Sequence, residues 1–349
     1  MKKIIIITLL IVTLSCSFLE PNEEVLYLKD GDIYLPIYTR GNPNSENYII
    51  WTHGGPGSSG MYYGDIEEIM PLQDNYRIIY WDQMSSGAST GNPSKDDFTV
   101  EKFSAHLDGV VKIVERRYHP KNLYLLGHSW GGYLASFYVA DKVENQDHFN
   151  GLILLNPILN IKRSLLESIS YIKDTYAPEQ IAKGVRVEYW EKAIDWYNDN
   201  LVDGKLYGKN IAKHYDYIEE AGGMLVQRDR NDELVSRLSV KMALMSPFHF
   251  YNYYTNQNNI RTYLKIEDAN LSNDSPQSQH LENITLPTLL IAGKDDKIAF
   301  KEMSEDWFEM FGTPSDNKIL KLYDNCGHAS FLDQPDQYVS DIKEFIGRY

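Results

Sequence analysis

The stretch that decides the fold is Leu123-Tyr-Leu-Leu-Gly-His-Ser129-Trp-Gly-Gly-Tyr-Leu-Ala135. It reads as an apolar strand, a Gly-x-Ser-x-Gly turn and the start of a helix, which is the pattern of a nucleophile elbow. A serine at such a turn adopts a strained backbone, and Gly127 and Gly131 let the strand and the helix approach each other. The pattern predicts that Ser129 presents its hydroxyl above the sheet edge as a nucleophile. The alternative is an ordinary strand-to-helix turn.

Two later strand-like runs end in the partners that a serine nucleophile needs, a base and a carboxylate that orients it. The first is Leu286-Pro-Thr-Leu-Leu-Ile-Ala-Gly293-Lys-Asp-Asp296, and the second is Ile319-Leu-Lys-Leu-Tyr-Asp-Asn-Cys-Gly327-His328. Ligand sites in open α/β sheets lie outside the carboxyl ends of the strands. We therefore expect Asp296 and His328 beside Ser129, as acid and base.

The acid has a competitor, because Asp295 and Asp296 are adjacent. Asp296 is favoured because Gly-x-x-Asp is the usual pattern of an acid loop, which leaves Asp295 as a solvated loop residue. The alternative for His328 is an ordinary loop histidine.

A glycine-rich turn follows an earlier strand-like run in Tyr48-Ile-Ile-Trp-Thr-His53-Gly-Gly-Pro-Gly57. A tetrahedral intermediate needs two N–H donors that already point at its oxygen. We expect these oxyanion-hole donors to be the amide of Trp130, directly after the serine, and the amide of Gly55. Taken alone, the turn is equally a plain Gly/Pro turn.

Three motifs together resemble the proline iminopeptidase branch of the α/β-hydrolase superfamily: His53-Gly-Gly-Pro-Gly57, Tyr80-Trp-Asp-Gln83 and Gly127-His-Ser-Trp-Gly-Gly132. The resemblance implies an α/β-hydrolase fold, that is, a mainly parallel sheet with helices on both faces and an inserted helical lid. It also implies a Ser-Asp-His triad that works through an acyl-enzyme.

No metal-ligand spacing and no phosphate-binding loop is seen, so we expect no cofactor and no metal.

One loop departs from the family pattern. Family members usually read Asp-Gln-Arg-Gly-x-Gly-x-Ser where this chain reads Asp82-Gln-Met-Ser-Ser-Gly-Ala-Ser89. The arginine and a glycine are thus replaced by Met84 and Ser85, in a loop that borders the active site in the family.

The order of patterns along the chain predicts its domains. Residues 25–40 read as a hairpin, 100–118 as a helix, and β-rich runs alternate with helical ones up to residue 156, which signals a mainly parallel sheet. Helical, tyrosine-rich sequence then follows until Pro287, too long for a loop. We expect a catalytic domain formed by residues 25–158 and 284–349, and a helical lid at 159–283 with candidate hinges or joints at Gly222-Gly223 and in the polar run 270–279.

The substrate depends on the lid. Aminopeptidases of this branch hold the free α-amine of the substrate with lid carboxylates, and the candidates here are Glu188, Glu191, Glu219 and Glu220. A glutamate on a helix is most often a solvated surface residue. The favoured function is an aminopeptidase of the proline iminopeptidase type acting on short peptides. The alternatives are an ester or lactone hydrolase on the same triad and, remotely, a non-catalytic binding protein.

The first residues read as a targeting signal. Lysines at positions 2 and 3 precede an apolar run at Ile4–Leu14, which is too short to span a bilayer comfortably, and Cys16 follows. We expect a bacterial lipoprotein signal at residues 1–16, with Cys16 lipidated, residues 17–24 as a polar tether and the enzyme held on an envelope membrane. Cleaved secretion and an uncleaved anchor are the alternatives. The net charge of −15 argues against a nucleic-acid partner.

Overall fold

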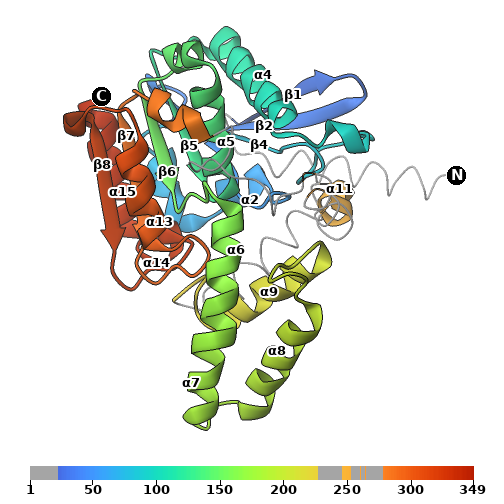
Figure 1. The fold of residues 1–349 in the computed structure, drawn as a ribbon. Helices are drawn as coiled ribbons and strands as arrows, with labels where there is room; N and C mark the ends of the chain where they lie inside the picture. The colour runs from blue at the N-terminus through green and yellow to red at the C-terminus, as the bar shows by residue number, and fades with distance from the viewer. Residues whose placement is uncertain (1–22, 227–245, 253–259, 261–263, 265–277) are drawn as a thin grey trace, which may run out of the picture.

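The computed structural model describes residues 23–226, 246–252, 260, 264 and 278–349, and in these residues eight strands form one sheet (Figure 1). The strands are β1 (Glu24–Asp30), β2 (Ile33–Gly41), β3 (Asn47–Thr52), β4 (Arg77–Trp81), β5 (Asn122–His128), β6 (Gly151–Leu155), β7 (Thr288–Gly293) and β8 (Lys318–Tyr323). Their order across the sheet is β1-β2-β4-β3-β5-β6-β7-β8. The β1–β2 hairpin and the β2–β4 pair are antiparallel, and every other pair is parallel. The predicted sheet is confirmed.

Helices cover both faces of the sheet, because its strands are apolar on both sides. Neighbouring residues such as Ile49 and Ile50 belong to two different buried clusters, as the alternation of a strand requires. One face carries α4 (Val100–Tyr118), α5 (Trp130–Asp141) and α13 (Lys301–Met310). The other face carries α2 (Gly60–Gly64), α3 (Met70–Gln73), α14 (Ser330–Asp333) and α15 (Pro335–Arg348).

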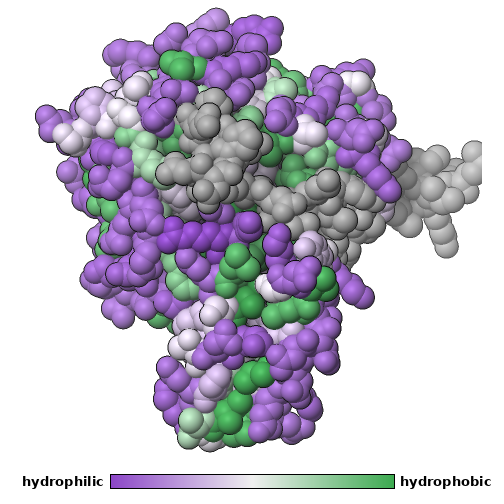
Figure 2. Space-filling view, in the orientation of Figure 1, coloured by the Kyte–Doolittle hydropathy of each residue, from purple (hydrophilic) through white to green (hydrophobic). Residues whose placement is uncertain are grey.

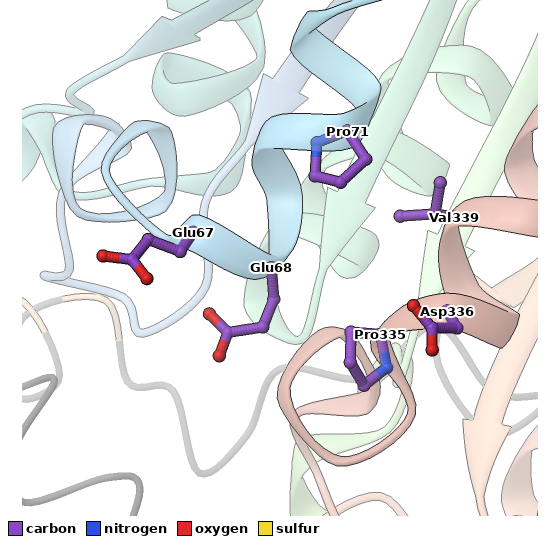
Figure 3. Close-up of a pocket in the computed structure, with 6 residues that line it drawn as sticks. All are labelled: Glu67, Glu68, Pro71, Pro335, Asp336 and Val339. Atoms are coloured by element: carbon purple, nitrogen blue, oxygen red, sulfur yellow. The ribbon is translucent and has the colours of Figure 1, made fainter.

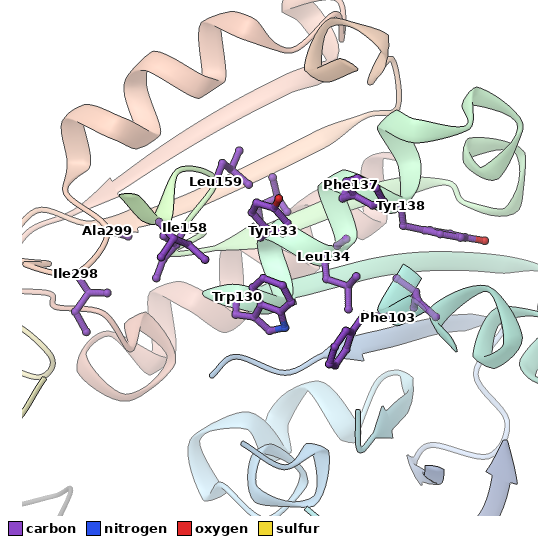
Figure 4. Packing of buried hydrophobic residues seen from close by; sticks show 14 of the residues in the cluster. Phe103, Trp130, Tyr133, Leu134, Phe137, Tyr138, Ile158, Leu159, Ile298 and Ala299 are labelled. Carbon is purple, nitrogen blue, oxygen red and sulfur yellow. The ribbon is translucent and has the colours of Figure 1, made fainter. Parts of the chain in front are cut away.

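Helix α5 is the central helix of the first face. Its residues from Trp130 to Ala140 are all buried, as expected for a helix that is apolar all round. Figure 4 shows the packing, in which Phe103 of α4 meets Trp130 edge-on and Trp130 stacks on Tyr133. The turn at Ser129 is therefore anchored to a helix that is buried in the core.

The sequence between β6 and β7 is mainly helical in its described residues. It forms α6 (Ile161–Ser170), a π-helical turn (Tyr171–Tyr176), α7 (Ala177–Ala182), α8 (Val187–Asn200), α9 (Lys209–Glu220) and α11 (Pro247–Tyr251). We call residues 161–220 the helical arm, because α6 and α7 project away from the sheet with α8 beside α7 (Figure 1). His214 of α9 joins three of its helices, bonding Ser168 of α6 at 2.8 Å and Tyr197 of α8 at 2.7 Å. That the insert acts as a lid with the bounds 159–283 stays a prediction.

Short 3-10 turns complete the described chain: Glu67–Ile69, Lys95–Asp97, Val143–His148, Ser278–Asn283 and Ser315–Asn317. The space-filling view shows a largely hydrophilic surface, with hydrophobic residues gathered on the helical arm (Figure 2). Leu166, Val185 and Val202 are among its exposed apolar side chains. Within the described residues, no helix combines the length and the apolar character needed to cross a membrane.

Two residues of the polar tether expected at residues 17–24, Glu23 and Glu24, belong to the folded domain. Glu23 forms an ion pair with the buried Arg40 at 2.9 Å, and Glu24 begins β1. The carboxylate of Glu24 accepts hydrogen bonds from Arg117 at 3.0 Å and from the Tyr118 hydroxyl at 2.6 Å. These two acids belong to the folded domain because arginines of β2 and α4 pair with them and the Tyr118 hydroxyl donates to Glu24. The signal segment, Cys16 and residues 270–277 of the expected polar run lie outside the described residues.

Candidate active site

Ser129 sits at the strained turn that the sequence predicts. It connects β5 to α5 with φ +56° and ψ −122°, a conformation that L-residues rarely adopt. The glycines on either side are needed for steric reasons. A Cβ on Gly127 would lie 2.3 Å from the carbonyl oxygen of Gly131, and a Cβ on Gly131 would lie 2.0 Å from that of Thr52.

The structure brings the three expected triad residues together. His328 Nε2 lies 2.8 Å from Ser129 Oγ, and His328 Nδ1 lies 2.8 Å from Asp296 Oδ2. All three side chains are buried. A carboxylate only accepts hydrogen bonds, so Nδ1 carries the hydrogen and Nε2 is free to accept the serine proton. This is the geometry that activates a serine hydroxyl.

The carboxylate of Asp296 is held by four donors. Its Oδ1 accepts from the amides of Ile298 and Ala299, each at 2.8 Å, and its Oδ2 accepts from Asn156 Nδ2 at 3.0 Å as well as from His328. Asp295, the competing acid, is exposed. The acid loop therefore turns Asp296 inward because two of its own amides bind that carboxylate.

Asn156 is a site residue that the sequence analysis missed. It follows β6 directly, has φ +42°, and donates from Nδ2 to the carbonyl oxygen of Gly327 at 3.1 Å in addition to Asp296. It thereby joins the loop of the acid to the loop of the base. A polar residue at the carboxyl end of a buried strand was the signal available.

The glycine-rich turn lies directly against the nucleophile. A Cβ on Gly54 would come within 3.0 Å of the Ser129 Cβ, so this position has no room for a side chain. The Gly54 amide donates to the Tyr63 hydroxyl at 3.3 Å. Gly55, the expected oxyanion donor, follows with φ +121°, and Trp130 supplies the first amide of α5. The oxyanion roles of Gly55 and Trp130 stay predictions.

Gln83 joins the elbow to this turn. Its Oε1 accepts from the indole N–H of Trp130 at 2.9 Å, and its Nε2 donates to the carbonyl oxygen of His53 at 2.9 Å. The preceding Asp82 is fully buried and accepts four hydrogen bonds, from Tyr38, Ser59, and the amides of Gly60 and Ala88. Asp82 and Gln83 thus hold the loops around Ser129 in place through hydrogen bonds.

The loop that departs from the family pattern has a backbone conformation at Ser85 that favours glycine. Ser85 has φ +58°, a left-handed conformation that costs a non-glycine residue about 1–2 kcal/mol. Met84 is completely buried in the apolar core, where the family has an arginine. Asn252, just after α11, donates to the carbonyl oxygens of Gly87 at 2.8 Å and Ser89 at 3.0 Å. Part of the insert is therefore seated on this loop.

The expected joint at Gly222-Gly223 contacts both loops of the triad. The amide of Lys297, next to the acid, donates to the carbonyl oxygen of Gly223 at 3.1 Å. The amide of His328 donates to the carbonyl oxygen of Met224 at 2.8 Å. The exit of α9 thus forms part of the support of the acid and the base.

The four candidate lid glutamates lie in different surroundings. Glu188 is 84% exposed and pairs with Lys192 at 2.7 Å, while Glu220 pairs with Arg186. Glu191 is exposed and Glu219 is half-buried. Two of the four carboxylates are therefore already neutralised by basic neighbours, and a role in amine binding stays a prediction for the set.

A surface hollow of about 300 Å³ lies between α3 and the start of α15 (Figure 3). It is lined by Glu67, Glu68, Pro71, Pro335, Asp336 and Val339. No triad residue lines it. In the part of the chain that the structure describes, no three His, Cys, Asp or Glu side chains are grouped as a metal site would need.

Comparison with known proteins agrees with this architecture. A family model described as "alpha/beta hydrolase fold" matches residues 47–335. The chain belongs to the α/β-hydrolase fold family. The chain is a hydrolase of this fold, and several proteins that it resembles are named proline iminopeptidases.

Individual relatives are distant but match over nearly the whole chain. A proline iminopeptidase of Thermoplasma volcanium is 23% identical over 330 residues, which are 92% of this chain and 95% of the relative. A proline iminopeptidase-related protein of Thermus thermophilus superposes with a TM-score of 0.60 at 18% identity, covering 94% of this chain and 98% of its own. An esterase of a Rhodococcus species superposes with a TM-score of 0.58 at 17% identity, covering 94% and 99%. Such structural likeness establishes the fold.

Proposed function

We propose that this protein is a serine hydrolase in which Ser129 is the nucleophile, His328 the general base and Asp296 the orienting acid. The observation that carries the proposal is the buried relay from Asp296 through His328 to Ser129, with both contacts at 2.8 Å. The three residues come from three loops at the carboxyl ends of β5, β7 and β8. A non-catalytic scaffold would have no need to maintain this arrangement.

The relay supports an acyl-enzyme reaction. Ser129 Oγ attacks the carbonyl carbon of the substrate while its proton passes to His328 Nε2. The amides of Gly55 and Trp130 receive the charge that forms on the carbonyl oxygen. The bond to the leaving group then breaks, and His328 returns the proton to that group. Water then attacks the acyl-enzyme in the same way, with His328 as base, and the carboxylic acid product leaves Ser129.

The favoured substrates are short peptides that lose an N-terminal residue, proline among them. Support comes from the relatives named proline iminopeptidase, which match 88% to 92% of the chain. The second candidate is a carboxylic ester or lactone. It is favoured by the buried Met84 in place of the family arginine and by the ion pairs that neutralise Glu188 and Glu220.

One panel of substrates tests the proposal. Prolyl and alanyl arylamides, their N-acetylated forms and short-chain aryl esters are given to the wild type and to Ser129→Ala. An aminopeptidase cleaves the arylamides that have a free amine and does not cleave their N-acetylated forms, whereas an esterase prefers the esters. Ser129→Ala should abolish turnover, and a fluorophosphonate should label Ser129. Labelling at another serine would refute the assignment.

Lid variants separate the two substrate classes. If a lid carboxylate binds the amine, Glu219→Gln or Glu191→Gln raises KM for the arylamide and leaves KM for the ester unchanged. Glu179→Gln is the matched control, since Glu179 lies outside the candidate set and pairs with Lys183 at 3.3 Å on the surface of the same arm. Equal effects of all three variants would argue against an amine site in the helical arm.

A further inference from the structure

His128, the residue directly before the nucleophile, bonds with both nitrogens of its ring. Its Nε2 lies 3.0 Å from the backbone carbonyl oxygen of His328, and its Nδ1 lies 2.9 Å from the Tyr63 hydroxyl. The Tyr63 hydroxyl in turn lies 3.3 Å from the amide nitrogen of Gly54. One continuous chain of hydrogen bonds therefore links the glycine-rich turn, the elbow and the loop of the base.

The position of every hydrogen in this chain is determined. Burial lowers the pKa of His128 to about 3, so its ring is neutral at ordinary pH and has one donor and one acceptor. A carbonyl oxygen only accepts, so Nε2 donates to His328 and Nδ1 accepts from the Tyr63 hydroxyl. That hydroxyl oxygen then accepts from the Gly54 amide. No member can be reversed, and each bond depends on the next.

Aromatic packing keeps these groups in place from the side. The ring of His128 lies 5.2 Å from that of His328 and 5.1 Å from that of Phe331, between centroids. Tyr63 also packs on Phe331, at 5.7 Å. Both Tyr63 and His128 are buried, so an unpaired polar atom here would have no water to replace its lost partner.

We propose that His128 and Tyr63 are positioning residues that align the base with the nucleophile and with the oxyanion turn. Neither side chain is in the Asp296–His328–Ser129 relay, and both act on it through backbone groups of Gly54 and His328. The inference rests on the proposed serine hydrolase function. It assigns a role to the histidine of the Gly-His-Ser motif and to a tyrosine that no motif marked.

Packing alone makes a different prediction from positioning. Tyr63→Phe keeps the ring and its contacts and removes only the oxygen. If Tyr63 serves the core alone, this variant behaves as wild type in catalysis. If it positions the base and the turn, the Gly54 amide and His128 Nδ1 both lose their partner, and the alignment loosens.

The test compares four single variants with the wild type, using steady-state kinetics and the rate at which a fluorophosphonate labels Ser129. We expect Tyr63→Phe to lower kcat about tenfold with KM little changed, since a broken buried hydrogen bond costs that order. His128→Leu should lower kcat further, and His128→Gln should recover part of it, because an amide both donates and accepts. Tyr124→Phe is the matched control, a buried β5 tyrosine whose hydroxyl bonds the distant Ile346 carbonyl oxygen at 3.2 Å.

The double variant Tyr63→Phe/His128→Leu adds a check on coupling. Its loss of kcat should be smaller than the product of the two single losses, because both single variants remove the same bond between Tyr63 and His128. A Tyr63→Phe variant with the kcat and labelling rate of Tyr124→Phe would overturn the inference and leave the proposed function intact. A wild type that is not labelled at Ser129 would overturn both. Thermal melting of each variant confirms that the fold is retained.

Discussion

Replacing Asp296 by asparagine is the sharpest perturbation that the site offers. The carboxylate accepts from two amides on Oδ1, and from Asn156 and His328 on Oδ2. An asparagine has one acceptor oxygen and one NH₂ group. If its oxygen faces the two amides, its NH₂ group faces two other donors. If it is flipped, its NH₂ group faces the amides instead.

The unflipped form disturbs the base directly, and the flipped form loses the two amide bonds that hold the side chain in place. Facing an NH₂ group, His328 is driven to carry its hydrogen on Nε2, where it can no longer accept the Ser129 proton. We expect Asp296→Asn to lower kcat about 10⁴-fold, or about 5 kcal/mol in the barrier, as for other triads that lose this carboxylate. The loss of kcat should be the same for arylamide and ester substrates, because the transfer of the Ser129 proton comes before the leaving group departs.

Asp295→Asn is the matched control, since it makes the same chemical change one residue away on an exposed side chain. Its kcat should stay close to that of the wild type. Both variants are assayed on the better substrate, with fluorophosphonate labelling of Ser129 and thermal melting alongside. If Asp295→Asn lost activity and Asp296→Asn kept it, our assignment of the acid would be wrong.

Three further predictions follow from the described residues and the signal segment. Asn156→Leu should lower kcat about tenfold, because Asp296 Oδ2 and the Gly327 carbonyl oxygen lose a buried donor; kinetics together with a melting curve would separate this from unfolding. Burial lowers the pKa of His214 to about 3, so its neutral form stabilises the fold fully above pH 6.5 and this contribution is lost as the pH falls toward 3. Urea titrations at pH 7, 6, 5 and 4 should show His214→Gln reducing the acid loss of unfolding free energy by about 1.4 kcal/mol per pH unit, and an unchanged slope would contradict this. Finally, Cys16→Ser should release the enzyme from the membrane fraction with unchanged turnover, whereas a native protein already in the aqueous phase would argue against lipidation.

The sequence predicted the elements that short-range patterns encode. The helix expected at residues 100–118 is α4, which begins after the Thr99 cap and ends at His119, in a left-handed conformation just before Pro120. The hairpin, the parallel strands and the elbow are likewise recognisable from alternation, apolar runs and glycine spacing over a few residues. Asp296 and His328 could be chosen because strand ends of a parallel sheet meet at one edge.

The contacts that align these residues could not be read from the chain. His128 bonds a carbonyl oxygen 200 residues away, Tyr63 bonds His128 across 65 residues, and Asn156 bonds Asp296 across 140. No local pattern marks such partners, because each is defined only when two distant loops meet. The place of Glu23 in the folded domain has the same cause, since its carboxylate pairs with the buried Arg40 of β2.

The sequence by itself therefore determined the sheet, the turn at Ser129 and the chain order of Ser129, Asp296 and His328, because backbone strain, periodicity and turn chemistry act between near neighbours. Only the tertiary structure decided how they are aligned. It brings four donors to the carboxylate of Asp296 and determines which nitrogen of His128 carries the hydrogen. It also places the carbonyl oxygen of Met224 where it accepts from the amide of His328. A buried polar group must find its partner wherever the folded chain supplies one, and that choice is made by the packing of the whole domain.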